Sequence, residues 1–228
     1  MSRLDDLAER LAAVRARIAA VRDPAEVTLV AVSKTWPASD VLLLRSLGVT
    51  DFGESYDAEA AAKAAMVRQA ATQVRWHFVG GVQRNKARGV ASYADVVHSV
   101  DRPQLADALG AAAVRAGRQI DALVQVRFDD DPGRSGVAPG EAHSLAGHVA
   151  ATDGLRLGGV MCVAPLGEAP RPVFARLREI AETIRHDHPD ATTISAGMTG
   201  DLEDALAEGA NCVRVGTALF GGRGPRTR

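Results

Sequence analysis

The sequence predicts a single (β/α)₈ barrel of the TIM type, with one extra helix at its N-terminus. Eight short, mostly apolar segments alternate with helical segments along the chain. This alternation favours parallel strands joined by right-handed crossovers. The length of 228 residues accommodates eight such units, so we expect one barrel domain spanning residues 1–228.

The N-terminal part of the chain changes from a helical to a strand pattern. Apolar residues recur at helical spacing at Leu4, Leu7, Leu11, Val14, Ile18 and Val21. Such spacing places one apolar stripe along a helix. After Asp23-Pro24, the apolar run Val27–Ser33 predicts a buried strand that ends at Lys34. Pro37 then opens a second helix, which Gly48 closes.

The same alternation continues to the end of the chain. The other predicted strands are Val49–Gly53, Val74–Val79, Val96–Ser99, Ala122–Arg127, Leu157–Val163, Thr192–Ala196 and Cys212–Gly216. The predicted helices between them are Asp57–Ala71, Asn85–Ser92, Pro103–Gly117, Gly140–Ala151, Pro172–His186 and Asp201–Glu208. The strands are apolar on both faces, which is typical of strands covered by helices.

Composition excludes several classes of protein. A formal net charge of -1 gives no electrostatic reason to expect a nucleic acid partner. No apolar stretch is long enough to span a membrane, and the charged segment Arg3–Arg10 does not resemble a signal peptide. We therefore expect a cytoplasmic protein that binds neither nucleic acid nor membranes. Cys162 and Cys212 lie in apolar runs without metal-ligand spacing, so we expect buried thiols and no metal site.

Lysine is scarce in this chain. The 27 basic residues comprise 24 arginines and three lysines, which are Lys34, Lys63 and Lys86. Arginine cannot form an imine, whereas a desolvated lysine can lose its proton and attack a carbonyl group. Lys34 follows an apolar strand, so it is either an ordinary strand-end lysine or a nucleophile.

The loops after predicted strands seven and eight have the composition of an anion site. Their glycine and hydroxyl residues are Ser195, Gly197, Thr199, Gly200, Gly216 and Thr217. Barrels often bind phosphate with these two loops, and the helix predicted from Asp201 directs free N–H groups into the first of them. Each loop by itself also fits a helix cap or a tight turn. A lysine amine and a phosphate cradle on one rim are the minimum needed to bind pyridoxal 5′-phosphate (PLP).

Two further polar residues lie within predicted strands. Arg214 is flanked by Val213 and Val215, so its charge needs a partner or a polar cavity. It is either a structural ion pair at the barrel floor or a residue that faces a ligand, and its place two residues before Gly216 favours the ligand. His77 either faces the barrel mouth or is a core histidine with its hydrogen bonds satisfied.

Motifs along nearly the whole chain resemble one known family. They are Ala31–Thr35, Phe52–Glu54, Trp76–Gly80 with Gln83, Asn85 and Lys86, His98–Asp101, Gly159–Met161, Ser195–Thr199 with Asp201, and Val213–Thr217 with Phe220-Gly221. In these segments the chain resembles the pyridoxal phosphate homeostasis proteins, which are single-barrel relatives of the N-terminal domain of alanine racemase.

The resemblance implies which residues bind the cofactor. PLP would form a Schiff base with Lys34, and Arg214 would face the pyridine nitrogen. An arginine there disfavours protonation of the ring and weakens it as an electron sink. The other implied cofactor-binding residues are Ser55, Ser195, Met198, Thr199, Gly216 and Thr217. The chain departs from the family pattern at Ser55, where asparagine is usual, at Ala196, where methionine is usual, and at Thr199, which replaces a serine.

The resemblance implies a function in PLP (vitamin B6) homeostasis, without catalytic residues or turnover. The expected partners are PLP and the PLP-dependent apoenzymes that would receive it, and the expected oligomeric state is a monomer. The first alternative is a small amino-acid racemase. Racemases need a base on each face of the substrate, and related alanine racemases take the second base from a C-terminal domain that we do not expect in this chain. The second alternative is a sugar-phosphate barrel in which Lys34 forms an aldolase-type imine.

Overall fold

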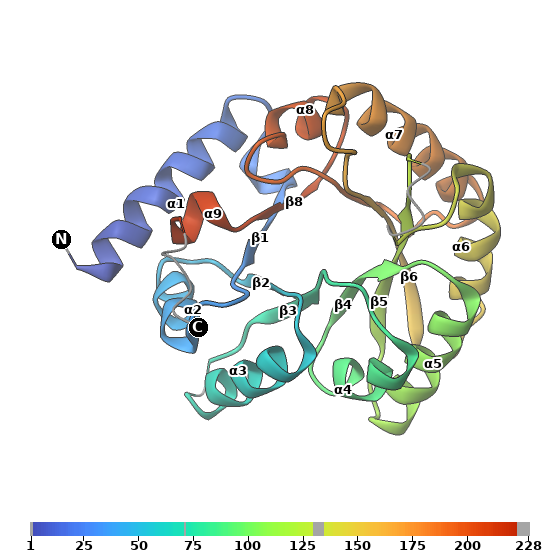
Figure 1. The fold of residues 1–228 in the computed structure, drawn as a ribbon, viewed down its shortest axis with the longest axis horizontal. Helices are drawn as coiled ribbons and strands as arrows, with labels where there is room; N and C mark the ends of the chain where they lie inside the picture. The colour runs from blue at the N-terminus through green and yellow to red at the C-terminus, as the bar shows by residue number, and fades with distance from the viewer. Residues whose placement is uncertain (1, 71, 130–134, 223–228) are drawn as a thin grey trace.

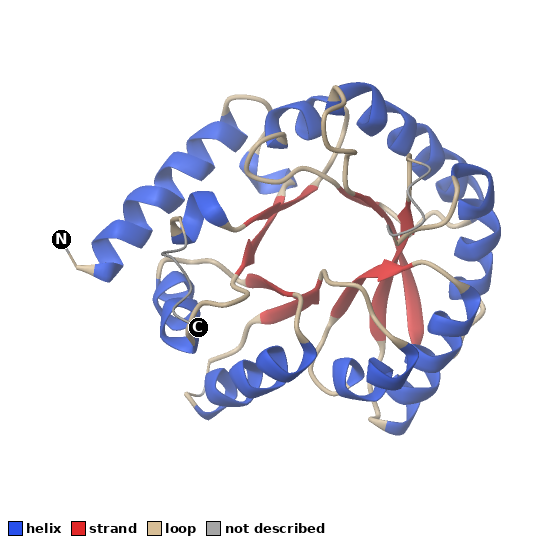
Figure 2. Ribbon diagram, in the orientation of Figure 1, coloured by secondary structure: helices blue, strands red, loops and turns tan. Residues whose placement is uncertain are grey.

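The computed structural model describes residues 2–70, 72–129 and 135–222, and in them eight parallel strands form a closed ring surrounded by helices (Figures 1 and 2). The strands are β1 (Thr28–Val32), β2 (Asp51–Glu54), β3 (Arg75–Phe78), β4 (Val96–Val100), β5 (Ile120–Val126), β6 (Leu155–Cys162), β7 (Thr193–Ser195) and β8 (Cys212–Val215). Each strand pairs with the next in the sequence, and β8 pairs with β1 in the register Thr28 to Cys212. The predicted (β/α)₈ fold is confirmed.

The helices cover the outer face of the barrel wall. They are α1 (Arg3–Ala19), α2 (Ala38–Ser46), α3 (Asp57–Gln69), α4 (Ala87–Ala91), α5 (Pro103–Arg115), α6 (Ala142–Ala150), α7 (Pro170–Asp187), α8 (Leu202–Ala207) and α9 (Thr217–Phe220). Short 3-10 helices occur at Pro24–Glu26, Arg84–Lys86 and Pro139–Glu141. None of the helices in the described ranges combines the length and the hydropathy needed to cross a membrane.

The extra helix α1 forms as its sequence pattern predicts. Ser2 and Asp5 make a reciprocal capping box at its start, which satisfies N–H groups that have no partner in the first turn. Four residues of the predicted stripe are buried, and the two end residues Leu4 and Val21 remain exposed. Helix α1 contacts α2, α8 and α9, so it covers the seam where β8 meets β1 (Figure 1).

Two helices differ from the prediction. The segment predicted as one helix from Asn85 to Ser92 is a 3-10 turn followed by the shorter α4. Helix α9 was not predicted, because its four residues are too few to show a helical period. Its position directly after β8 proves important for the site.

The interior of the barrel is unusually polar. Most buried apolar side chains form one cluster that includes the contacts between strands and helices, whereas Val96, Leu123 and Met161 form a small separate cluster. Barrel interiors are usually filled by branched aliphatic side chains. Here the strands also contribute six buried polar residues, and four of them form hydrogen bonds with one another inside the ring, namely His77, His98, Ser195 and Arg214; the other two are Glu54 and Ser99.

The two cysteines are buried free thiols, as the sequence predicts. Burial raises the pKa of Cys162 to about 12 and that of Cys212 to about 11. Both therefore remain protonated at neutral pH, and neither supplies a thiolate nucleophile.

Candidate functional site

A cavity of about 480 Å³ opens where the strands of the barrel end. Its volume lies within the range of small-molecule and cofactor pockets, about 300–1,000 Å³. Seven of the eight predicted site residues line it: Lys34, Ser55, Met198, Thr199, Arg214, Gly216 and Thr217. Apolar lining comes from Val32, Trp36, Val79 and Val163. The structure thus brings the predicted amine and the predicted anion loops to one cavity.

Lys34 lies on a backbone segment that is held from both sides. Its neighbour Thr35 has φ +70°, a left-handed conformation that non-glycine residues rarely adopt. The Thr35 N–H donates to a carboxylate oxygen of Glu59. On the other side, Lys63 Nζ donates to the Ser33 carbonyl at 2.8 Å. These bonds restrain the peptide units next to Lys34 and so limit where its side chain can reach.

A buried charge cluster supplies this restraint. Lys63 Nζ contacts Glu54 Oε1 at 2.5 Å and Glu59 Oε1 at 3.0 Å, and the Ser33 hydroxyl donates to Glu54 Oε1 at 2.6 Å. Burial raises the pKa of Glu54, and the opposing effect of Lys63 does not fully offset it. Within the described residues, Glu54 Oε2 is buried without a hydrogen-bond partner.

Lys63 and its carboxylates were not identified as site residues from the sequence. A signal did exist, because Lys63 belongs to the face of α3 that buries Ala60, Ala64 and Val67. A lysine at such a position requires a buried partner. The sequence pattern does not say which carboxylate meets it, since Glu54 comes from a different element.

Arg214 reaches the cavity from strand β8. Its side chain is 5% exposed; Nη1 donates to Ser195 Oγ at 2.5 Å and Nη2 to the Cys162 carbonyl at 2.8 Å. Among the ion pairs of the described residues none involves Arg214, and burial lowers its pKa. Arg214 therefore lines the cavity, and within the part of the chain that the structure describes it forms no ion pair at the barrel floor.

Ser195 is the one predicted site residue that does not line the cavity. It is fully buried, accepts a hydrogen bond from Arg214, and lies 2.9 Å from His98 Nδ1. His77 is likewise a buried interior residue and does not line this cavity, so the core-histidine alternative is correct.

The loop after β7 needs a glycine at its start. Gly197 has φ +87°, and an added Cβ would lie 2.8 Å from Ala205 Cβ and 3.1 Å from Leu202 Cα. No side chain fits between this turn and α8. The Gly197 carbonyl accepts the Arg214 backbone N–H at 2.9 Å, which ties the loop to the strand that carries the arginine.

The two predicted anion loops contact each other. Thr199 Oγ1 accepts the Ala218 N–H at 3.4 Å, and Gly216 lies at the N-cap of α9. The first N–H groups of a helix have no partners in its own hydrogen-bond ladder. In chemical terms the cavity offers one amine, one buried guanidinium and hydroxyl groups, a set suited to a phosphorylated carbonyl compound.

Comparison with known protein families supports this description. Residues 9–224 match the family model described as "Alanine racemase, N-terminal domain". The chain is 41% identical to a pyridoxal phosphate homeostasis protein of Pseudomonas aeruginosa, with 96% of this chain and 97% of that protein covered. Proteins of the same name from Mycobacterium leprae and Escherichia coli K12 are 40% and 36% identical, each over 96% of this chain and over 93% and 98% of their own lengths.

Solved structures show the same similarity. PipY of Synechococcus elongatus with PLP bound has a TM-score of 0.85 and 34% identity, covering 94% of this chain and 100% of that one. Alanine racemase of Streptomyces lavendulae has a TM-score of 0.76 at 20% identity and is matched over 57% of its length, with 96% of this chain covered. The racemase similarity concerns the fold alone.

Proposed function

The chain belongs to the pyridoxal phosphate homeostasis protein family, and from that premise we propose that it binds PLP through Lys34 and holds the cofactor for intracellular vitamin B6 homeostasis without turnover of its own. The observation that carries the proposal is that Lys34, Arg214 and both anion loops line one cavity. PLP supplies an aldehyde that condenses with a lysine amine, a phosphate, and a ring nitrogen that accepts hydrogen bonds.

The residues present fit this cofactor. Lys34 is the single amine among the described residues that line the cavity. Arg214 is a buried guanidinium with no carboxylate partner in the described structure, so a neutral pyridine nitrogen is a suitable acceptor for it. Thr199, Gly216 and Thr217 are proposed to hold the phosphate, with Ser55 and Met198 beside the cofactor.

We assign Ser195 a different role from the one that the resemblance implies. Its hydroxyl lies against Arg214 and not on the cavity wall, so its proposed contribution is to hold the guanidinium.

The ionisable groups of the cavity support a carrier more than a racemase. Of the described lining residues, Lys34 and Arg214 are the ones that carry ionisable side chains. Racemisation needs a second base on the opposite face of the substrate, and arginine stays protonated. We therefore propose no appreciable racemase turnover. Robust alanine or serine racemisation that requires Lys34 would contradict this.

The absorption spectrum tests the assignment. Purified protein mixed with PLP should develop a band near the visible edge that borohydride bleaches, and the reduced adduct should map to Lys34 by mass spectrometry. Lys34→Ala should lack both. Lys86→Ala is the matched control, because Lys86 is exposed and lies outside the cavity. A wild-type protein without the band, or a band that persists in Lys34→Ala, would reject the proposal.

The same spectrum addresses the aldolase-type alternative, in which Lys34 reacts with a sugar phosphate. That alternative predicts no visible band with PLP, but borohydride trapping of a carbonyl sugar phosphate on Lys34.

The proposed setting is the cytoplasm, with the chain as a monomer and PLP-dependent apoenzymes as recipients. Incubation of the loaded protein with a PLP-free aminotransferase should restore the activity of that enzyme. Light scattering should report the mass of one chain.

A further inference from the structure

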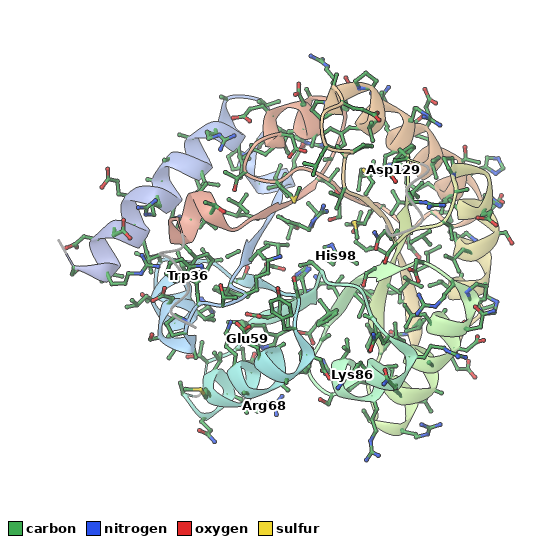
Figure 3. All side chains as sticks on the ribbon, in the orientation of Figure 1. Trp36, Glu59, Arg68, Lys86, His98 and Asp129 are labelled. Carbon is green, nitrogen blue, oxygen red and sulfur yellow. The ribbon has the colours of Figure 1, made fainter. Side chains whose placement is uncertain are left out.

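A chain of hydrogen-bonded side chains crosses the interior of the barrel. It starts at Arg214, which lines the cavity, and passes to Ser195 Oγ at 2.5 Å. Ser195 Oγ lies 2.9 Å from His98 Nδ1, and His98 Nε2 lies 2.8 Å from His77 Nδ1. His77 Nε2 ends the chain 2.8 Å from Asp51 Oδ1. Four strands besides β8 contribute to it, and His98 lies inside the ring of strands in Figure 3.

Such a chain is not the expected way to fill a barrel. Buried polar groups are destabilising unless every one finds a partner, and aliphatic side chains would pack the same space without that requirement. His98 and Ser195 are essentially inaccessible, and His77 is 4% exposed. Each member nevertheless has a partner on both sides, so the network is complete from end to end.

The two ends of this hydrogen-bond network, Arg214 and Asp51, give it a direction. A guanidinium can only donate hydrogen bonds, and a carboxylate can only accept them. If each member passes one donor onward, Ser195 donates to His98 Nδ1, His98 donates from Nε2 to His77, and His77 donates from Nε2 to Asp51. Both histidines then carry their proton on Nε2.

The surroundings of His98 favour this arrangement. Burial lowers the pKa of His98 well below its ordinary value, and the nearby His77, Arg214 and Arg75 act in the same direction. Hydrogen bonds from His77 and Thr50 hold the pKa of Asp51 below its ordinary value although burial opposes them. A neutral His98 and an ionised Asp51 are what the direction requires.

The end of the hydrogen-bond network that is remote from Arg214 approaches solvent on the other side of the barrel. His77 and His98 line a second, polar cavity of about 220 Å³, together with Arg75, Asp121 and Asn211. Arg75, Asp121 and Asn211 lie at or next to the starts of strands, whereas the cofactor cavity lies at strand ends. The hydrogen-bond network therefore joins the two ends of the barrel.

We propose that Ser195, His98, His77 and Asp51 form a directional hydrogen-bond relay that holds the Arg214 guanidinium against the cofactor ring. This rests on the proposed function, because it takes Arg214 as the residue that faces the pyridine nitrogen. The four residues are positioning residues, since they act on the cofactor through Arg214.

Histidine NMR tests the direction without the cofactor. In protein labelled with ¹⁵N-histidine, His77 and His98 should both show the neutral tautomer protonated at Nε2 near neutral pH. His77→Gln and His98→Gln assign the two signals. A His98 signal with its proton on Nδ1, or a charged His98, would overturn the directional relay.

Cofactor release tests the positioning role. Ser195→Ala breaks a hydrogen bond to the charged Arg214 guanidinium and should speed PLP release about tenfold. His98→Leu removes the acceptor of the Ser195 hydroxyl and should speed release in the same direction. The absorption band of the loaded protein should also shift. His98→Gln should restore most of the wild-type behaviour, because its amide offers one acceptor and one donor. Val96→Ala removes buried volume from the barrel interior without removing a relay group, and should leave the band in place.

The results distinguish the two proposals. Failure of wild-type protein to bind PLP rejects the proposed function, whereas the NMR result on unliganded protein still decides the direction of the relay. Wild-type release rates and an unshifted band in folded Ser195→Ala and His98→Leu would reject the positioning role while leaving PLP binding intact. If His98→Leu does not fold, Asp51→Asn at the partly buried end of the network replaces it, with a smaller change expected in the same direction.

Discussion

At the scale of single residues, the three lysines occupy three different environments. Lys34 lies on the cavity wall, Lys63 is buried against two glutamates, and Lys86 is exposed. Under the proposed function, Lys34 carries the chemistry and Lys63 provides structural support. Lys63 restrains the backbone that carries Lys34, through the Ser33 carbonyl and through Glu59.

We expect Lys63→Met to be strongly destabilising. It leaves the Glu54 carboxylate buried without its partner, and removal of one member of a buried ion pair lowers the free energy of unfolding by about 3–5 kcal/mol. Urea denaturation at neutral pH measures the change. The loss should shrink at lower pH, because Glu54 can then take up a proton.

Lys86→Met is the matched control for this measurement. The same substitution at an exposed site should change the free energy of unfolding by less than about 0.5 kcal/mol. Equal stability of the two variants would show that the Lys63 cluster does not stabilise the barrel.

At the scale of elements, α1 holds part of the site in place. Arg17 donates to Glu203 Oε1 at 2.6 Å and to the Thr199 carbonyl at 2.9 Å. The helix outside the eightfold repeat therefore fixes the loop after β7.

Arg17→Ala should weaken PLP binding more than it weakens the fold. The ion pair is partly exposed and contributes at most about 1 kcal/mol to stability. Release of the Thr199 loop should lower PLP affinity about two- to fivefold, as measured by absorbance titration.

Arg22→Ala provides the comparison. Arg22 also bonds to a glutamate and to backbone carbonyls, those of Gly209 and Ala210, but at the start of β8 and so at the far end from the cofactor cavity. It should leave PLP affinity unchanged. Equal effects of the two substitutions would mean that Arg17 acts on the site only through general stability.

At the scale of the whole molecule, the polar interior should make stability depend on pH. The pKa of His98 is lowered by burial, so below about pH 6.5 the unfolded chain binds a proton at this site that the folded chain excludes. This contribution to stability is complete above the unfolded pKa and is lost as the pH falls.

For His98 alone, the free energy of unfolding should fall with decreasing pH by up to about 1.4 kcal/mol per pH unit. Urea titrations of wild type and His98→Gln from about pH 7 to about pH 5.5 measure this slope. It is the change with pH in the difference between the two free energies of unfolding, because the glutamine does not titrate. A difference that stays constant over this range would show that His98 is protonated equally in both states.

The sequence by itself determined the architecture and the end of the barrel at which the predicted site residues lie. The strand and helix periods predicted eight alternating units, and those units place Lys34, Gly197 and Gly216 at strand ends of one barrel face. Such features depend on neighbours in the chain, so local patterns are sufficient to predict them. The assignments of individual cofactor contacts stay predictions.

Tertiary structure alone decided the contacts that cross the barrel. The Lys63–Glu54 pair and the chain from Arg214 to Asp51 join residues from different strands and helices. Whether they meet depends on strand register and on which side chains share a level of the interior. Periodicity specifies the face on which a residue lies but not the partner opposite to it, because that partner is set by closure of the ring.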